Sequence, residues 1–314
     1  MTEVTDLKHE FHDAEEMSLK LRHTRVSAMQ VSRGAFQSTW MHAFVGRYSL
    51  QFIEFKNGTS ICSGDAPSDG YAMLVPLRFT PGSRLLGREL NRNSIGFYAP
   101  GSEHADLTVA GCNEVVIVIP REQMLRATDE IDLPKEGSQL RSASVNGLER
   151  LRRILARIPA ALEASPSALT AEAERNLSDI LGRAIDGTLR SDSDLFDVSL
   201  GRPKLPRAAI MRRIGEILAE REDEPVYAGE LASLLGISQP SLQRVFQEWF
   251  GMSPARYLAL RRLHLVRRRL RKPEGSTVTE IAGSSGFWDL SRFSKRYKDV
   301  FGELPSTTLR SSRQ

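Results

Sequence analysis

Two groups of side chains in the last third of the chain have the chemistry needed to read the edges of DNA bases. The first group is Gln239, Ser241, Gln243 and Arg244, and the second is Leu290, Ser291, Arg292 and Lys295. Arg and Lys can hydrogen-bond to guanine O6 and N7, and Gln can bond to adenine N6 and N7. Each good bidentate contact discriminates between bases by about 1–3 kcal/mol.

The two groups lie in a sequence unit that occurs twice. The first copy covers residues 230–254 and the second covers residues 280–305, with one additional residue in the turn of the second copy. The matching pairs are Glu230 and Glu280, Ala232 and Ala282, Gly236 and Gly286, Arg244 and Lys295, Phe246 and Tyr297, Phe250 and Phe301, and Pro254 and Pro305. An internal repeat of this kind predicts two similar structural elements.

Each copy has the pattern of a helix-turn-helix. A small residue, Ala232 or Ala282, allows a second helix to cross closely, and a glycine ends the first helix because it accepts positive φ. A longer helix follows, with apolar residues at i, i+4 and i+8, so that one face is buried. The second helix of such a motif can lie in the major groove, and its N-terminal residues on the face opposite the core contact bases.

A helix between the copies is predicted to hold them at a fixed distance. Ser253 is a good N-cap and Pro254 suits the first helical position. About 17 residues rising about 1.5 Å each hold the two reading helices roughly 25–30 Å apart, close to one DNA turn of about 34 Å. One chain is therefore expected to read two adjacent major-groove segments of an asymmetric site. Of the arginines in this helix, including Arg261, Arg262 and residues 267–269, only a minority are expected to contact phosphates.

The pattern L-A…G-I-S…L-x-R-x-F…G-M-S-P-x-x-Y-L…R…I-A…G-F-x-x-x-S-R-F-S-K-R-Y-K…F-G-x-x-P resembles the DNA-binding domain of the AraC/XylS family of transcription regulators. The resemblance covers about residues 207–310. The motif Gly286-Phe287-Trp288, followed by Leu290 and Arg292-Phe293-Ser294, is most similar to the branch of the family that contains the ethanolamine-operon regulator. Pro240 and Val266 depart from the family pattern, and Pro240 offers no hydrogen bond to a base.

The resemblance implies a regulator with two parts. The N-terminal half would be a sensor, often a cupin-like β-barrel, that binds a small-molecule inducer. The protein would activate transcription by binding double-stranded promoter DNA, with RNA polymerase as a further candidate partner and a homodimer as the expected assembly. The family resemblance implies no enzyme activity and no cofactor.

Composition agrees with two domains and a division of charge between them. The chain has 314 residues, and from Arg207 onward 19 Lys and Arg stand against 12 Asp and Glu, a net charge of +7. The remaining residues carry 24 basic and 27 acidic side chains, a net charge of −3. A basic C-terminal part fits nucleic-acid binding. The charged N-terminus lacks an apolar signal core and no run is long enough to span a membrane, so a cytoplasmic protein without membrane contact is expected.

The N-terminal half is predicted to be rich in strands. Alternating or apolar segments separated by Gly and Pro cover residues 26–31, 40–45, 49–55, 71–77, 95–98 and 114–119. Asn57-Gly58 predicts a hairpin, and many short strands at this spacing favour a β-sandwich or barrel. Helical patterns follow at 121–127, at 145–158 before Pro159, and at 167–189, and they either cover the β domain or form a dimer contact.

These patterns predict an α+β chain. A β-barrel or cupin-like sensor domain with accessory helices, also serving dimerisation, would span residues 1–190. A polar linker without regular pattern would span 191–206, and an all-α DNA-binding domain with two helix-turn-helix motifs would span 207–314. Cys62 and Cys112 are expected to be buried, reduced thiols.

His104 is the one candidate ligand-binding residue in the N-terminal half. It follows the turn Pro100-Gly101-Ser102-Glu103, and such a turn can bring a histidine to the mouth of a cupin-like cavity. No histidine spacing indicates a metal site, and no G-x-S-x-G motif indicates a nucleophile, so no metal or catalytic residue is predicted. Two alternatives stay open: an N-terminal half that only dimerises, and a cupin-type enzyme with an appended DNA-binding module, against which the lack of a His-rich metal cluster counts.

Overall fold

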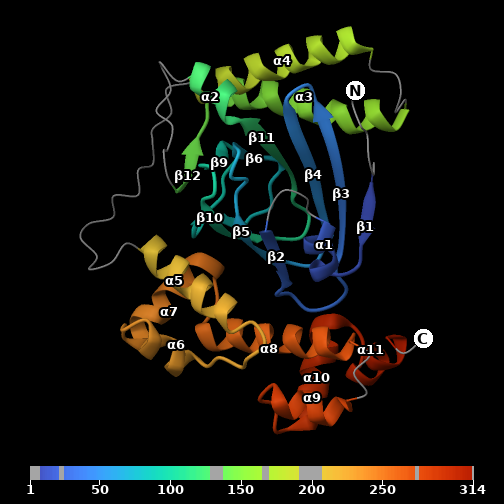
Figure 1. Ribbon diagram of the computed structural model, residues 1–314, viewed down its shortest axis with the longest axis vertical. Helices are drawn as coiled ribbons and strands as arrows, with labels where there is room; N and C mark the ends of the chain where they lie inside the picture. The colour runs from blue at the N-terminus through green and yellow to red at the C-terminus, as the bar shows by residue number, and fades with distance from the viewer. Residues whose placement is uncertain are drawn as a thin grey trace. The chain divides into compact units, whose positions relative to one another are not determined.

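The computed structural model describes residues 8–20, 25–127, 137–164, 170–190, 207–272 and 276–312 (Figure 1). By contacts, the chain divides into two compact units. The first contains residues 1–28 and 37–199 and is here called the β unit. The second contains residues 29–36 and 200–314 and is here called the helical unit. Each unit is described by itself.

The strands of the β unit form two sheets. The seven-stranded sheet has the order β1 (His9–Phe11), β3 (Gln37–Val45), β4 (Tyr48–Asn57), β11 (Asn113–Pro120), β6 (Gly70–Arg78), β9 (Ser94–Tyr98) and β12 (Ser138–Ser142). The five-stranded sheet has the order β2 (Arg25–Gln30), β5 (Ser60–Asp65), β10 (Glu103–Thr108), β7 (Arg84–Leu85) and β8 (Arg88–Glu89). The predicted α+β class and β-rich N-terminal half are confirmed, although the strands form two sheets and not one closed barrel.

Two helices cover one face of the seven-stranded sheet. The helices of this unit are α1 (Ala14–Lys20), α2 (Arg121–Ala127), α3 (Val145–Ala164) and α4 (Ala171–Leu189), and Figure 1 shows α3 and α4 lying across the sheet. Alternate residues of β11, including Val115 and Ile117, share a buried core with Leu151 and Leu155 of α3 and Leu181 of α4. Each fully buried aliphatic side chain contributes about 1.5–3 kcal/mol.

The predicted hairpin at Asn57-Gly58 is wrong. β4 is already paired along both edges, with β3 and with β11, so no edge is free for the next strand. Gly58, at φ 86°, lets the chain leave this sheet, and β5 pairs with β10 in the other sheet. The Asn-Gly pair therefore marks a turn between two sheets.

The predicted helix end before Pro159 is also wrong. α3 continues through Pro159 to Ala164. The buried residues Leu155, Ile158 and Leu162 lie on both sides of the proline and pack into one core. This continuous apolar face outweighs the hydrogen bond that proline removes from a helix interior. The first residues of the helix predicted at 167–189 and the predicted linker 191–206 lie outside the described residues.

The helical unit contains two helix-turn-helix pairs joined by a longer helix. Its helices are α5 (Arg207–Glu220), α6 (Ala228–Leu234), α7 (Gln239–Phe250), α8 (Pro254–Leu270), α9 (Val278–Ser284), α10 (Leu290–Phe301) and α11 (Pro305–Ser311). The two sequence copies form the pairs α6–α7 and α9–α10, and α8 connects them, as the repeat predicted. None of the helices among the described residues combines the length and apolarity needed to cross a bilayer.

Candidate nucleic-acid interface

The first reading helix, α7, begins and ends on defined caps. The Ser238 Oγ accepts a hydrogen bond from the backbone N–H of Ser241 at 3.3 Å, and Pro240 lies in the first turn, where it removes no helical hydrogen bond. Gly251 ends the helix in the left-handed conformation at φ 63°. One face is buried, through Leu242, Val245, Phe246, Trp249 and Phe250. The opposite face is exposed.

The second reading helix, α10, repeats this construction with different side chains. The Asp289 carboxylate accepts a hydrogen bond from the backbone N–H of Arg292 at 2.9 Å, and Gly302 ends the helix at φ 77°. Its buried face consists of Phe293, Tyr297, Val300 and Phe301. The same turn bond recurs in both copies: Ile237 N–H donates to the Ala232 carbonyl at 3.1 Å, and Phe287 N–H donates to the Ala282 carbonyl at 3.0 Å.

Gly286 is required in the second turn for two reasons. Its φ of +82° lies in the left-handed region. A Cβ at this position would also collide with the hydroxyl of Tyr227. Gly236, the equivalent glycine in the first copy, has φ +63° and open space around it. The two copies therefore share backbone geometry but differ in how tightly the turn is packed.

Most of the predicted base-reading residues are exposed on these two helices. The exposed side chains are Gln239, Gln243 and Arg244 on α7, and Leu290, Ser291, Arg292 and Lys295 on α10. Ser241 is half-buried, and its hydroxyl lies 2.9 Å from that of Ser238, so it already has a partner at the helix start. The assignment of these residues to base contacts stays a prediction.

The arginines of α8 mostly bind within the helical unit. Arg261 donates to the backbone carbonyls of Leu218, Arg221 and Glu224, at 2.7, 2.5 and 2.9 Å. These carbonyls belong to the end of α5 and the loop after it, where a helix has no further amide donors. Burial lowers the pKa of the Arg261 guanidinium. Arg261 is thus a brace between α8 and α5.

Three neighbouring arginines of α8 also contact residues of the helical unit. The guanidinium of Arg262 lies 4.6 Å from the centre of the Tyr227 ring and donates to the Val226 carbonyl at 3.3 Å. Arg269 donates to the Asp223 carbonyl at 2.7 Å and to the hydroxyls of Ser284 and Ser285. Arg268 forms an ion pair with Glu222 at 3.0 Å.

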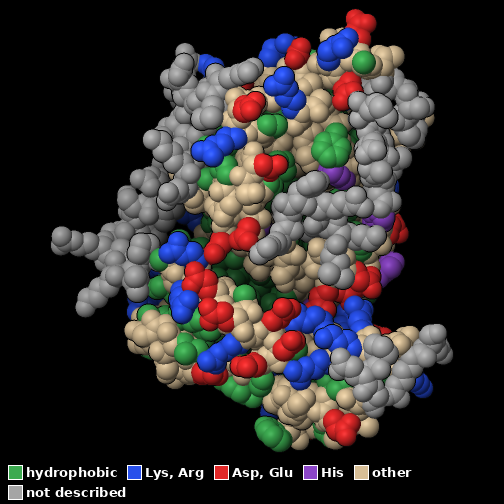
Figure 2. All heavy atoms as spheres, in the orientation of Figure 1, with side chains coloured by type: hydrophobic (Ala, Val, Ile, Leu, Met, Phe, Trp, Pro, Cys, Tyr) green, Lys and Arg blue, Asp and Glu red, His purple; other side chains and the backbone are tan. Residues whose placement is uncertain are grey.

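The remaining arginine of this run is buried in the second half of the unit. Arg267 forms an ion pair with Glu303 at 3.4 Å, and its guanidinium lies 4.4 Å from the centre of the Phe301 ring. The run that sequence composition presents as a basic stripe is therefore largely internal structure. Sequence patterns missed this role because the partners, which are backbone carbonyls, carboxylates and aromatic rings, lie far away in the chain. On the face drawn in Figure 2, Lys and Arg side chains of the helical unit are interspersed with Asp and Glu.

Residues 29–36 are a part of the helical unit that sequence reasoning did not assign to it. The Gln30 side-chain amide donates to the Val300 carbonyl at 2.9 Å, and Gly34 N–H donates to the Asp299 carbonyl at 2.9 Å. His264 of α8 lies 2.9 Å from the Gln30 carbonyl through its Nε2. This segment therefore binds the last turn of α10.

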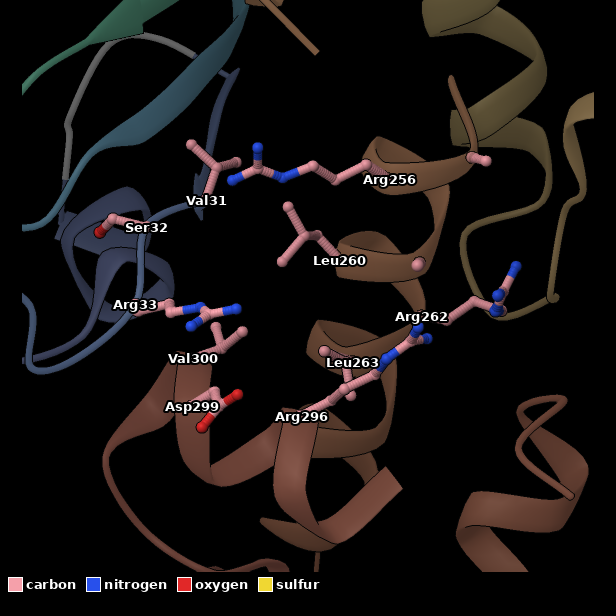
Figure 3. Close-up of a pocket in the computed structure, with 12 residues that line it drawn as sticks. Val31, Ser32, Arg33, Arg256, Leu260, Arg262, Leu263, Arg296, Asp299 and Val300 are labelled. Atoms are coloured by element: carbon pink, nitrogen blue, oxygen red, sulfur yellow. The ribbon is translucent and has the colours of Figure 1, made fainter. Parts of the chain in front are cut away.

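A pocket of about 850 Å³ lies beside this segment (Figure 3). Its cationic lining residues are Arg33, Arg256, Arg262 and Arg296, and Asp299 supplies one carboxylate. Figure 3 shows the Arg256 side chain extending from α8 toward Val31. The pocket is not at His104, which belongs to the β unit.

In the β unit, polar side chains lie on the face of the seven-stranded sheet that α3 and α4 leave uncovered. His42, Ser49, Gln51 and Glu114 are all buried, and they alternate along their strands with the apolar residues under the helices. The His42 Nε2 lies 2.8 Å from the Ser49 Oγ. Buried polar groups are uncommon and usually hydrogen-bonded. The interior between the two sheets is thus polar along part of its length.

His104 takes part in a cluster that bridges the two sheets. Its Nδ1 lies 2.9 Å from the Asp106 carboxylate, and the Tyr98 hydroxyl donates to the same oxygen at 3.1 Å. His104 and Asp106 come from β10, and Tyr98 comes from β9 of the other sheet. The His104 side chain is 14% exposed. The structure therefore orients the predicted ligand-binding histidine, while its binding of a ligand stays a prediction.

Glu114 adds an unusual carboxyl group to this region. Burial, and secondarily the nearby Asp106 charge, raise the pKa of Glu114 to about 8. The group is therefore mostly protonated at pH 7 and can donate a hydrogen bond. Burial also raises the pKa of Cys62 to about 12, so this thiol is unreactive at neutral pH. Among the described residues, no three His, Cys, Asp or Glu side chains are grouped so that they could hold a metal ion.

Comparison with known proteins places the C-terminal region in a defined family. Residues 231–311 match a family described as a helix-turn-helix domain. Over 229 residues the chain is 27% identical to the XylDLEGF operon transcriptional activator 1 of Pseudomonas putida, covering 69% of this chain and 70% of that protein. Over 97 residues it is 36% identical to the HTH-type transcriptional regulator GbdR of Pseudomonas aeruginosa, covering 30% of this chain and 26% of GbdR. The crystal structure of the AraC-like transcriptional activator CuxR aligns with a TM-score of 0.42 at 12% identity, covering 88% of this chain and 99% of CuxR.

Proposed function

Because the chain belongs to the AraC/XylS family of transcription regulators, we propose that α7 and α10 read two adjacent segments of promoter DNA while the β unit binds a small-molecule inducer. The protein is a sequence-specific DNA-binding regulator. The observation that supports the reading assignment is the duplicated helix-turn-helix, in which both second helices present an exposed polar face. The predicted branch within the family stays a prediction.

We assign residues 1–190 to sensing and dimerisation, residues 191–206 to a linker, and residues 207–314 to DNA binding. The relatives are named as transcriptional activators and regulators, which favours activation and speaks against an appended enzyme. A homodimer in the cytoplasm that contacts RNA polymerase at the promoter completes the proposal. Inducer binding would shift the population of states able to bind DNA.

A selection of genomic fragments at moderate salt tests the DNA-binding proposal. We expect the full-length protein to enrich one or a few promoter regions, because base contacts add to the salt-sensitive attraction of phosphates. Footprinting on the enriched fragment should show two protected major-groove segments about one helical turn apart. Binding that is uniform across sequences and disappears with added salt would contradict the proposal, provided that saturating metabolite extract does not restore selectivity.

A thermal-shift screen with small metabolites tests the inducer proposal. A ligand that binds only the native β unit stabilises it, by about 2.7 kcal/mol at a concentration of 100 times Kd. We expect a hit to raise the melting temperature of the wild type and to lose most of this effect in His104→Ala, because His104 lies in the polar cluster between the sheets.

His12→Ala is the matched control, since His12 is an exposed histidine of the same unit. It should respond to the ligand like the wild type. A screen without any hit, together with a stable dimer, would favour the alternative in which the N-terminal half only dimerises. A hit that His104→Ala retains would remove His104 from the site and leave the inducer proposal in place.

A further inference from the structure

Trp288 is the most exposed large apolar side chain among the described residues, at 87% exposed. The other two tryptophans of the chain, Trp40 and Trp249, are 3% and 7% exposed. Tryptophan carries a large apolar surface and is highly buried on average in folded proteins. An almost fully exposed tryptophan therefore indicates a contact with another molecule.

The usual structural role for an apolar residue at this position is already filled. Trp288 directly precedes Asp289, the N-cap of α10, and an apolar residue there commonly packs against the fourth helical residue, which is Phe293. In this chain Phe287 packs against Phe293, with ring centres 5.0 Å apart, and is itself buried. Trp288 is thus not needed to fix the start of the helix.

The place of Trp288 in the repeat indicates what it contacts. In the first copy, the half-buried turn residue Ile237 is followed directly by the N-cap Ser238, whereas in the second copy Trp288 is inserted between Phe287 and Asp289. It lies at the N-terminal end of α10, the part of a recognition helix that approaches base edges. Leu290, two residues further on, is a second exposed apolar side chain, at 39%.

The charge around Trp288 favours DNA over an apolar protein surface. The exposed basic side chains of α10 are Arg292, Lys295, Arg296 and Lys298, and the carboxylates beside them are Asp299 within α10 and Asp289 at its N-cap. Protein interfaces are depleted in charged residues, lysine among them, at their core. A cationic helix with an apolar tip suits the major groove, where thymine offers a methyl group beside hydrogen-bonding edges.

We propose that Trp288 is a specificity-determining residue that packs against a thymine 5-methyl group in the segment read by α10. The proposal rests on the proposed DNA-binding function and adds a residue that hydrogen-bonding chemistry alone does not identify. It predicts a preference for A·T pairs at the position next to the N-terminus of α10. The first reading helix, whose turn has no residue corresponding to Trp288, lacks this preference.

Intrinsic fluorescence tests the contact directly in the full-length protein. Because the other two tryptophans are buried, acrylamide quenches mainly Trp288. We expect the promoter fragment recovered by the selection to protect this fluorescence, and an unrelated fragment to protect it less. The affinity of Trp288→Ala should fall about tenfold, within the range for loss of an aromatic contact to a base, whereas Trp288→Phe should retain part of the affinity.

Replacing thymine by deoxyuridine, one position at a time, locates the methyl group. At one position in the α10 segment, deoxyuridine should weaken wild-type binding about fourfold, the value of one buried methyl-sized group, and should leave binding by Trp288→Ala unchanged. Leu304→Ala is the control, because Leu304 is an exposed apolar residue of the same unit outside the reading helices. Its affinity should equal that of the wild type.

The outcomes separate this proposal from the function on which it rests. Specific DNA binding with unchanged quenching of Trp288 and normal affinity of Trp288→Ala would overturn the proposal and leave the function intact. Protection that depends on protein concentration without DNA would show that a second copy covers Trp288, and would also overturn it. Failure of the wild type to select any fragment, both without and with saturating metabolite extract, would overturn both.

Discussion

Arg244→Ala is expected to lose sequence specificity over one half of the binding site and to retain it over the other. Arg244 is exposed on α7, opposite the buried residues Leu242 and Phe246. Loss of one good base contact costs about 1–3 kcal/mol, or roughly 5- to 150-fold in affinity for the preferred base. Lys295→Ala on α10 should give the mirror result, with loss of specificity in the other half of the site.

The measurement is a selection from a randomised version of the enriched promoter site, carried out with wild type, Arg244→Ala and Lys295→Ala. Arg212→Ala is the control, because it removes one exposed positive charge from α5 without touching a reading helix. This variant should at most change the salt dependence of DNA-binding affinity, and its base preferences should equal those of the wild type. If Arg244→Ala weakens binding uniformly across all sequences, Arg244 contacts phosphate and the base-reading assignment is wrong.

Arg261→Ala is expected to destabilise the helical unit by about 2–4 kcal/mol. Its guanidinium donates to three backbone carbonyls at the end of α5 and in the loop after it, and hydrogen bonds from charged donors contribute about 1.5–3 kcal/mol each, less where solvent has access. The three carbonyls would lose this donor together. Arg261→Lys should recover only part of the loss, because an ammonium lacks the planar fork of the guanidinium.

Arg256→Ala is the matched control for this prediction. Arg256 is an exposed arginine of the same helix, so its removal should change stability by about 0.5 kcal/mol or less. Urea unfolding followed by tryptophan fluorescence, to which Trp249, buried in the helical unit, contributes, measures both variants. Equal stability of Arg261→Ala and wild type, together with weakened DNA binding, would show that Arg261 contacts phosphate and not α5.

Sequence patterns predicted the reading helices well because their determinants are local. The N-cap Ser253 of the connecting helix, the turn glycines and the i, i+4 spacing of Phe246 and Phe250 all act within one or two helical turns. The same reasoning predicted most strands of the β unit, since alternation is also local. The repeat strengthened the prediction of two helix-turn-helix motifs because the same pattern occurs in both copies.

The features that sequence patterns missed depend on distant partners. Asn57-Gly58 predicted a hairpin, but the pairing of β4 with β11, more than fifty residues later, had already used the free edge. Pro159 predicted a helix end, but the core under α3 holds both halves in one helix. Arg261 was one of several α8 arginines of which only a minority were expected to contact phosphates, and nothing in the sequence shows that its partners are carbonyls at the end of α5 and in the loop after it. Trp288 was missed because its high exposure becomes visible only in the fold.

The 17-residue length of α8 has a consequence for how such a site can change. An α-helix turns about 100° and rises about 1.5 Å per residue. Because α8 packs against α6 and α7 of the first helix-turn-helix pair and against α9 of the second, a single inserted residue would rotate one reading helix about a quarter turn relative to the other. The two reading helices would then no longer face the major groove on the same side of the DNA duplex. We therefore expect new operator preferences to arise from exposed side chains of α7, of α10 and of the turn before α10, and not from a change in the number of residues in α8.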